Sequence, residues 1–512
     1  MKTIVLLMDS LNRRYLSVYG GTRVKTPNID RLADRSCVFE NHFVGSAPCM
    51  PARHDILTGR LDFLERNWAP VQPFDCTLPQ VLRQHGIFSE LITDHYHYFH
   101  LGGENYFPLF DSWEFIRGQE HDTLAPNLGE PIQKPHYGNY DEQYERNRLL
   151  FKEEADYPSP KTFSEAAAFL ERYHSEDFLL FVDSFDPHEP FDYPDDTPNE
   201  YGDRYNDKLF YWPNYGAADA VPEEAVEHAR KRYAEVVSMS DRWLGKLLDV
   251  MDRYDLWEDT AVFFTTDHGF LLGEKNLLGK NFMPCYNEVY HIPLLVHLPG
   301  MTARTHCGAL TQNIDLMPTI LALHGIPQSA CRYPLHGHNL LPLLNKEVQS
   351  VRDSVLYGMF GRQVNIFDGR YTYFRSAARA DNQPLFLYTA MPSTINHYWD
   401  EDHLTDLGAI TAGPYLKWTK YPVYRIPGNT TVLADFSHRF TVRDEVVSQN
   451  MLFDIQEDPL QEHPIHDEAL ERNLCEKLVS EMERHDSPEE QFERLGLTPF
   501  RTQHTEGGGK NL

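Results

Sequence analysis

Cys49 lies in the first stretch whose residue types could carry chemistry, GSAPCMPARHDILTGR at residues 45–60. It stands between Pro48 and Pro51. Because proline fixes its own backbone angle and restricts the residue before it, we expect this segment to be rigid. Arg53 follows four residues after the cysteine. Two interpretations are open: a buried structural thiol in a loop before a helix, or a nucleophile whose backbone must not move.

Three short polar clusters stand where predicted strands end. They are Asp9-Ser10, Asp186-Pro187-His188 and Asp267-His268. The strands of a doubly wound sheet open onto one crevice at their carboxyl ends, so Asp9, Asp267 and His268 could bind a divalent cation there. A lone aspartate at a strand end is also a common helix cap, which is the alternative for each residue taken singly.

The elements that must position these residues alternate along the chain. Apolar runs at residues 3–8, 88–93, 178–185 and 261–269 predict buried strands, and amphipathic stretches at residues 26–35, 77–86, 164–174 and 224–254 predict helices between them. This order predicts an α/β fold with a large, mostly parallel sheet flanked by helices. The loop-rich stretch at residues 192–215 is expected to rim the pocket.

The pattern changes near residue 345. Alternating apolar runs surround Asp368-Gly369, which indicates an antiparallel hairpin. We therefore predict a catalytic domain at residues 1–345, a smaller C-terminal α+β domain carrying an antiparallel sheet at residues 346–490, and a tail at residues 491–512 with a flexible end.

Composition limits the function classes. The chain has 512 residues, 41% of them hydrophobic, and a formal net charge of −29, which argues against binding to nucleic acid or an anionic membrane. Its seven cysteines form no C-x-x-C pair, which favours a reducing compartment. The apolar run before Asp9 is too short for a signal peptide or a membrane span. We expect a cytoplasmic protein; the oligomeric state stays open.

Five motifs follow one another in a fixed order. They are TPNIDRLA (26–33), CMPARHDILTG (49–59), DPHEPF (186–191), TTDHGFLLGEKNLLGK (265–280) and LFDIQEDPLQE (452–462). The second is similar to the C-x-P-x-R signature of the type I sulfatases of the alkaline phosphatase superfamily. The third has that family's His-x-Pro, and the fourth resembles its second metal segment with the downstream lysine. The resemblance runs from residue 3 to about residue 465.

This resemblance implies a modified nucleophile. Cys49 would be oxidised to formylglycine by a formylglycine-generating or anaerobic sulfatase-maturing enzyme. In the family, one hydroxyl of the hydrated aldehyde attacks sulfur and the alcohol leaves, and the second hydroxyl then expels sulfate. The reaction is thereby divided into two easier steps.

The resemblance also implies a metal. Asp9, Asp267 and His268 would hold a divalent cation, with the modified Cys49 as a further ligand. Ser10 stands where many members have a second aspartate and is the weakest candidate ligand. Because calcium prefers oxygen ligands while imidazole also suits manganese, we expect calcium and leave manganese open.

The family also assigns roles to three further side chains. Arg53 would fix the nucleophile and offset its charge, since a guanidinium holds its acceptors rigidly. Lys280 would contact the sulfate oxygens, and His188 would protonate the leaving oxygen. The alternatives are a surface salt bridge for Arg53 and a loop histidine on the rim for His188.

One segment departs from the family. Many sulfatases carry a Lys-x-His pair where this chain reads ITDHYHYFH (92–100). Without the lysine, His95 or His97 could contact the substrate, or either could pack in a loop. A branch that cleaves phosphonate monoesters and phosphodiesters also lacks that lysine and has an Asp-His metal pair, and residues 273–280 resemble that branch. The charged turn RGQEHD (117–122) could bind substrate or be a solvated face.

We therefore expect a sulfatase that hydrolyses a small anionic sulfate ester, with a sulfated sugar or an aryl sulfate as substrate. The first alternative is a phosphonate monoester or phosphodiester hydrolase with the same nucleophile. The alternative of another class is a non-catalytic anion-binding protein with unmodified Cys49. The aromatic stretch at residues 397–421 could stack on a sugar ring or form an ordinary domain contact.

Overall fold

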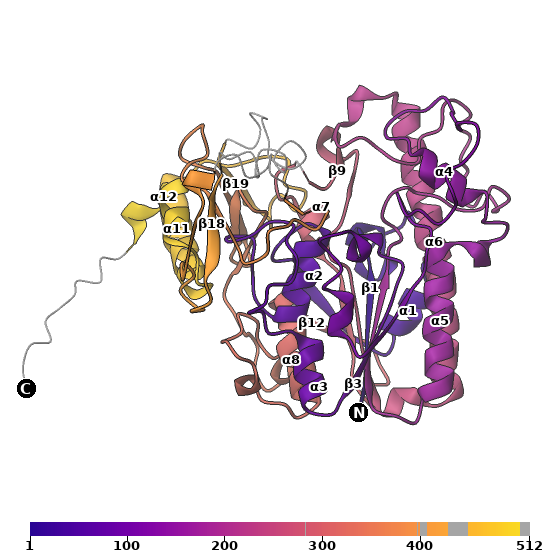
Figure 1. The fold of residues 1–512 in the computed structure, drawn as a ribbon, viewed down its shortest axis with the longest axis horizontal. Coiled ribbons are helices and arrows are strands. Elements are labelled where there is room, and N and C mark those ends of the chain that lie inside the picture. Colours follow the sequence, from indigo (N-terminus) through magenta and orange to yellow (C-terminus); the bar gives the residue numbers. More distant parts are fainter. Residues whose placement is uncertain (282, 397, 400–406, 429–448, 502–512) are drawn as a thin grey trace, which may run out of the picture.

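Strand β1 (Lys2–Met8) lies in the middle of the main sheet. All seven of its residues are therefore buried. The computed structural model describes residues 1–281, 283–396, 398–399, 407–428 and 449–501, and Figure 1 shows its fold. Along the sheet the order is β10 (His291–Ile292), β2 (Cys37–Phe43), β11 (Leu294–His297), β7 (Thr260–Thr265), β1, β5 (Phe178–Ser184), β3 (Phe88–Thr93) and β4 (Ser112–Phe115), and β12 (Thr305–Gln312) pairs with β2.

The main sheet is mostly parallel, as the sequence predicts. Strands β7, β1, β5, β3 and β4 run side by side in one direction. Strand β11 is antiparallel to both β7 and β2, and β10 is antiparallel to β2. The carboxyl ends of the central parallel strands therefore meet at one edge of the sheet, which is where a site in such a fold is expected.

Helices cover both faces of this sheet (Figure 1). Alternate side chains of β1 separate into two cores: Ile4, Leu6 and Met8 pack on one face, and Val5 and Leu7 on the other. The first face carries α1 (Pro27–Ala33), α5 (Pro158–Tyr173) and α6 (Glu223–Arg253), and the second carries α2 (Cys49–Thr58), α3 (Leu78–Gln84) and α8 (Leu316–Leu323). Thr26, which precedes α1, makes no capping hydrogen bond through its side chain; the carboxylate of Asp241 accepts from the Asn28 and Ile29 backbone N–H groups instead.

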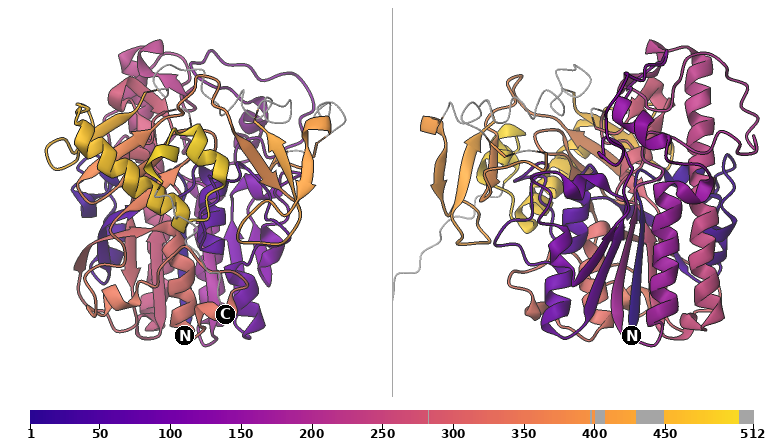
Figure 2. Two further views of the ribbon diagram at one scale, coloured as in Figure 1. Left: turned by 90° about the vertical axis from the view of Figure 1, so that its left-hand side faces the viewer. Right: turned by 45° about the vertical axis from the view of Figure 1, so that its right-hand side comes forward.

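The C-terminal region contains the predicted hairpin. Asp368-Gly369 joins β14 (Val364–Phe367) to β15 (Tyr371–Arg375) in an antiparallel sheet with β13 (Val355–Gly358) and β19 (Met451–Asp454). Helices α11 (Glu468–Arg484) and α12 (Glu489–Arg494) lie beside this sheet (Figure 2). The domain boundary predicted at residue 490 lies within α12. Phe492 of this helix packs in the same hydrophobic core as the antiparallel sheet. The end of the tail, residues 502–512, lies outside the described residues.

The remaining elements are short. They are α4 (Glu142–Arg148), α7 (Asn287–Tyr290) and α9 (Leu341–Leu344), the sheet β6 (Gly216–Ala217), β9 (Leu277–Gly279), β8 (Leu271–Leu272), and the sheet β16 (Phe386–Thr389), β18 (Val423–Pro427), β17 (Thr411–Gly413). Part of the predicted stacking stretch, residues 397 and 400–406, lies outside the described residues. Within the described part of the chain, every helix is too short or too polar to cross a membrane.

Candidate active site

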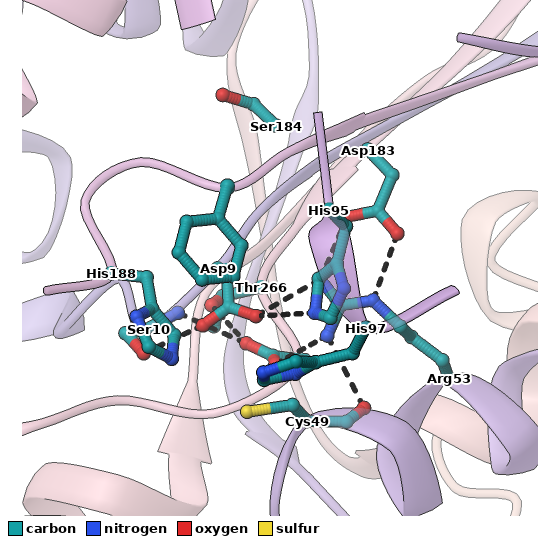
Figure 3. A network of polar contacts seen from close by, with 12 residues as sticks. Asp9, Ser10, Cys49, Arg53, His95, His97, Asp183, Ser184, His188 and Thr266 are labelled. Atoms are coloured by element: carbon teal, nitrogen blue, oxygen red, sulfur yellow. Dashed lines mark hydrogen bonds and ion pairs between the residues drawn. The ribbon is translucent and has the colours of Figure 1, made fainter. Parts of the chain in front are cut away.

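The predicted metal residues and Cys49 meet at the carboxyl edge of the main sheet, and Figure 3 shows Asp9, Ser10 and Cys49 at this place. Asp9 follows β1, Asp267 and His268 follow β7, and Cys49 begins α2. Each of these four residues offers one ligand atom, and the four atoms lie within 4.8 Å of one another. All four side chains are buried. The structure thus brings together residues that are more than 200 positions apart in the sequence.

Helix α2 places Cys49 at its first turn, two residues before Pro51. Proline suits this position because the first helical N–H groups have no partner in the helix. Gly59 ends the helix with a left-handed φ of 65°, as the sequence predicts. The carboxylate of Asp55 accepts hydrogen bonds from the backbone N–H and the hydroxyl of Ser46, which ties the chain before Cys49 to the helix.

The thiol of Cys49 lies against an imidazole. Its Sγ is 3.2 Å from Nε2 of His268, whose Nδ1 lies 2.9 Å from the backbone oxygen of Gly269. With its proton on Nδ1, His268 presents the lone pair of Nε2 to Cys49. Burial, and then the charge of Asp9, raises the pKa of the Cys49 thiol well above its usual range. As an unmodified thiol, Cys49 is therefore protonated and a poor nucleophile.

Arg53 is fully buried and joins three carboxylates. Its Nε and Nη2 donate to the two oxygens of Asp183 at 2.8 and 2.7 Å. Its Nη1 donates to Asp267 at 2.6 Å, and Nη2 lies 3.0 Å from Asp9. This bidentate pairing fixes the guanidinium. Asp183 was missed in the sequence, where it reads as part of an apolar strand; its position near the end of β5 was the available signal.

The protonation of Asp9 and Asp267 bears on how well this cluster suits a divalent cation. Burial would raise the pKa of Asp9, but Arg53 holds it well below its usual range, while burial and Asp9 raise the pKa of Asp267 to about 7. Asp9 Oδ2 accepts no hydrogen bond among the described residues. Two carboxylates, an imidazole and Cys49 form a mixed O, N and S donor set that suits such a cation.

Ser10 and Lys280 form the next layer of contacts. Lys280 Nζ donates to Ser10 Oγ at 2.8 Å, and Ser10 Oγ donates to Asp9 Oδ1 at 2.6 Å. Nζ also lies 3.8 Å from Asp9 and 3.5 Å from Glu189. Lys280 is therefore held beside the metal residues, whereas the role of Ser10 as a metal ligand stays a prediction.

The two histidines that the sequence left open lie in different places. His95 is fully buried, with Nε2 at 3.3 Å from Asp9 Oδ2, and does not line the cavity. His97 lines it, and its Nε2 lies 2.9 Å from Glu120 Oε2. His188 lines the cavity too; its Nδ1 lies 2.5 Å from the backbone oxygen of Glu189 and 3.7 Å from Glu120.

A cavity of about 960 Å³ opens above Cys49. The stretch at residues 192–215 contributes Trp212, Asn214 and Tyr215 to its wall, which confirms the predicted rim. The charged turn at residues 117–122 contributes His121 and the buried Glu120, so the turn is part of the wall. Sequence reasoning assigned no role to the other lining residues: Trp68, Tyr96, Phe99, His100, Leu101, Asn139, Tyr140, Asp141, Glu189, Asn281 and Asn396.

Comparisons with known proteins agree with this geometry. The Sulfatase family model matches residues 2–326, and a model described as N-sulphoglucosamine sulphohydrolase, C-terminal, matches residues 273–409. The choline-sulfatase of Rhizobium meliloti is 24% identical over 426 residues, covering 76% of this chain and 80% of its own length. The N-acetylglucosamine-6-O-sulfatase of Bacteroides thetaiotaomicron is 23% identical over 414 residues, covering 68% and 72%.

A solved structure carries the same fold. The phosphonate monoester hydrolase of Agrobacterium radiobacter superposes with a TM-score of 0.65 at 18% identity, covering 94% of this chain and 96% of that one. This likeness confirms the predicted alkaline phosphatase-like architecture of a large sheet and a smaller antiparallel region.

Proposed function

The chain belongs to the sulfatase family, and we propose that it hydrolyses small sulfate esters with a formylglycine nucleophile made from Cys49. The observation that carries this proposal is the position of Cys49. Its side chain lines the cavity and lies within 4.8 Å of ligand atoms from Asp9, Asp267 and His268. A nucleophile and a cation site so placed can act on the same ester.

The environment of Cys49 favours a modified nucleophile over a thiolate. Before any cation binds, the raised pKa of its thiol keeps the unmodified side chain protonated. A hydrated aldehyde would supply two hydroxyls, one to attack sulfur and one to release sulfate afterwards. We infer that a formylglycine-generating or anaerobic sulfatase-maturing enzyme acts on the segment around Cys49 before the chain folds, because the folded helix buries it.

Asp9, Asp267, His268 and the modified Cys49 would hold one divalent cation, with calcium proposed and manganese as the alternative. When bound, such an ion polarises a sulfuryl oxygen and lowers the pKa of the attacking hydroxyl. The chain's own part is orientation: Arg53, clamped by Asp183, keeps the two aspartates in place.

Lys280 and His188 would act on the ester itself. Lys280, held by Ser10, is placed to bind the sulfate oxygens. His188 Nδ1 faces the backbone oxygen of Glu189, which leaves Nε2 to donate a proton to the leaving oxygen. Burial, and then Lys280, lowers the pKa of His188 well below its usual range. Because a bound sulfate ester is an anion beside Lys280, it offsets that second effect and favours the protonated histidine.

The substrate is proposed from the shape of the cavity and the names of the relatives. A wall with Trp68, Trp212 and Tyr215 can stack on a sugar or an aryl ring. One relative is a choline-sulfatase and another an N-acetylglucosamine-6-O-sulfatase. We propose a small sulfated saccharide or aryl sulfate as substrate and a cytoplasmic location.

The second candidate is hydrolysis of phosphonate monoesters or phosphodiesters. It is favoured by the absence of the family's Lys-x-His lysine from residues 92–100, by His97 in the cavity, and by the Asp267-His268 pair. Values of kcat/KM for matched aryl sulfate and aryl phosphonate esters separate the two functions. We expect the sulfate to be preferred more than about tenfold, some 1.4 kcal/mol of transition-state binding. The reverse preference would make the phosphonate the substrate.

The candidate of another class is an anion-binding protein with unmodified Cys49. It predicts binding of sulfate without turnover of any ester. Hydrolysis of aryl sulfate by protein that carries the aldehyde, and none by a Cys49→Ala variant, would rule it out.

A further inference from the structure

The charged side chains of the cavity wall include more carboxylates than lysines or arginines, and its other basic side chains are four histidines: His97, His100, His121 and His188. Three lining side chains are carboxylates: Glu120, Asp141 and Glu189. Among the lining residues that the structure describes, Lys280 is the only lysine or arginine. Burial raises the pKa values of Glu120 and Glu189 to about 7, so above this pH all three carboxylates are ionised. An opening with this imbalance then has a negative potential, which low-dielectric walls strengthen. A sulfated ligand must therefore place its sulfate at Lys280 and its remaining groups against carboxylates.

Lys280 is not available to a second anion. It is 2% exposed and already contacts Ser10 Oγ, Asp9 and Glu189. Its charge is balanced within the floor of the site before any substrate enters. The proposed sulfate position uses the face of Lys280 that remains toward the cavity.

Three histidines in the wall, His97, His100 and His188, do not reverse this balance. Burial lowers the pKa of His97 to about 3 and that of His100 to about 4. The pKa of His188 is also lowered, by burial and then by Lys280. These three imidazoles are therefore neutral in the resting site and offer no positive charge to a second acidic group of a ligand. The fourth, His121, is paired with a carboxylate of the wall, because its Nδ1 lies 2.6 Å from Asp141 Oδ2.

Two buried oxygen atoms of the lining residues, Asn281 Oδ1 and Glu189 Oε2, accept no hydrogen bond within the described part of the chain, although their residues are only 7% and 1% exposed. Glu189 Oε2 has ion-pair contacts alone, at 3.5 Å from Lys280 Nζ and from His188 Nδ1. Buried acceptors without donors are costly, and a ligand that brings N–H, O–H or a positive charge would relieve them. A carboxylate or second sulfate would add to the penalty.

Aromatic rings complete the wall. Trp68, Tyr140, Trp212 and Tyr215 line the cavity. Their faces are electron-rich and attract cations as well as sugar or aryl faces. Acids and rings together form the usual surroundings of an organic cation, and neither favours an anion.

We infer that this cavity selects sulfate esters whose leaving group carries no second negative charge, and that it prefers a cationic leaving group to a neutral one. This inference rests on the proposed sulfatase function and names its substrate class. Esters of amino alcohols, of amino sugars with a free amine, or of phenols bearing an ammonium group belong to this class. Polysulfated and uronate-bearing saccharides are excluded from it.

Three aryl sulfates that differ only in a remote charge test the inference. They carry a para-ethyl arm ending in trimethylammonium, hydroxyl or sulfonate, so that the arm insulates the phenol from the charge. The assay uses holoenzyme with the Cys49 aldehyde at pH 8.5, above the raised pKa values of about 7 of Glu120 and Glu189. We expect kcat/KM for the ammonium ester to exceed that for the sulfonate by about tenfold or more, with the hydroxyl ester between them.

Glu120→Gln should narrow the ammonium-to-sulfonate ratio by about threefold, because it removes a carboxylate from the wall. Glu457→Gln changes the net charge equally at an exposed position outside the cavity and should leave the ratio unchanged. If Glu120→Gln does not fold, the wild-type ratio at low and high salt decides, since screening should bring it toward one.

The outcomes separate the inference from the proposed function. Hydrolysis of all three esters at equal kcat/KM, or a preference for the sulfonate, would overturn the inference and leave the sulfatase intact. A ratio that Glu120→Gln and salt leave unchanged would also overturn it. No hydrolysis of any of the three by aldehyde-bearing, metal-loaded protein would remove the proposed function, and the inference with it.

Discussion

Two buried clusters of acids and imidazole groups adjoin helix α2, and they differ in how their charges are satisfied. The cavity cluster consists of Asp9, Cys49, Asp267 and His268, and the enclosed cluster consists of His54, Asp55 and Asp62. In both, the potential ligand atoms lie within 4.8 Å of one another. Donor types and spacing alone would nominate either as a metal site.

The two clusters differ in the contacts of their side chains and in the space beside them. In the enclosed cluster His54 lies between two carboxylates, 2.8 Å from Asp75 and 3.1 Å from Asp62, and the void beside it is only about 10 Å³. In the cavity cluster Cys49 lines an opening of about 960 Å³, and the other three members lie directly behind it. A buried charge group that is paired internally supports the fold, whereas one that opens to a large cavity is positioned for a ligand.

The largest expected effect is loss of the nucleophile. Cys49→Ala should lower kcat by about 10⁴-fold or more, because no other group can replace it. The melting temperature should change little, since only one buried sulfur is removed. Cys285→Ala, which removes another buried thiol away from the cavity, is the matched control and should keep activity. Activity of Cys49→Ala close to that of the wild type would refute the assignment.

Metal removal should distinguish the clusters next. Chelation should reduce turnover by about a hundredfold or more while secondary structure persists, and calcium or manganese should restore it. Asp267→Asn should lower the metal content measured by mass spectrometry, and Asp62→Asn in the enclosed cluster should not. Full activity of metal-free protein, or metal loss from Asp62→Asn, would contradict the division between the clusters.

His54→Leu should affect stability rather than catalysis. It leaves two buried carboxylates without their shared partner, which should cost about 3 kcal/mol or more in the free energy of unfolding by urea. Turnover per folded molecule should stay within about threefold of the wild type. His306→Leu, at a half-exposed histidine beside Glu40, should cost less than about 1 kcal/mol. A reversed order of these losses would be inconsistent with a structural role for the enclosed cluster.

The smallest effect concerns pH. Glu65 lies next to the enclosed cluster, and burial raises its pKa to about 7 although it accepts from Trp418 Nε1 at 2.8 Å. A carboxyl with a raised native pKa contributes stability that is complete below its unfolded pKa and is lost as pH rises through about 7. Between pH 5 and pH 8, the free energy of unfolding of the Glu65→Gln variant should therefore fall by roughly 1–2 kcal/mol less than that of the wild type. If the free energy of unfolding changed equally with pH in both proteins, this role of Glu65 would be wrong.

The sequence predicted the cavity cluster because each member follows a strand or begins a helix, and Cys49, Asp267 and His268 also lie within motifs. It could not predict Asp183, whose neighbours are those of an ordinary buried strand, or the enclosed cluster, whose members are brought together by folding without a periodic pattern. The alternation of apolar runs indicated the parallel strands. The reversed direction of β11 was not accessible, since a short buried run has the same composition in either direction.

The walls of the cavity show the same limit. The motif histidine His188 was identified, but Glu120 in a charged turn could equally have been a solvated face. Its burial depends on packing against segments far away in the chain. Localisation and the metal's identity stay predictions for the same reason, as they depend on surroundings that local patterns do not describe.

The most direct test is the mass of the tryptic peptide that contains Cys49, from protein co-produced with a maturing enzyme, followed alongside turnover of an aryl sulfate. The account predicts an aldehyde in place of the thiol, and turnover that rises in proportion to the aldehyde fraction. A peptide that retains the thiol, from protein that hydrolyses the ester and with the maturing enzyme active on a control substrate, would contradict it.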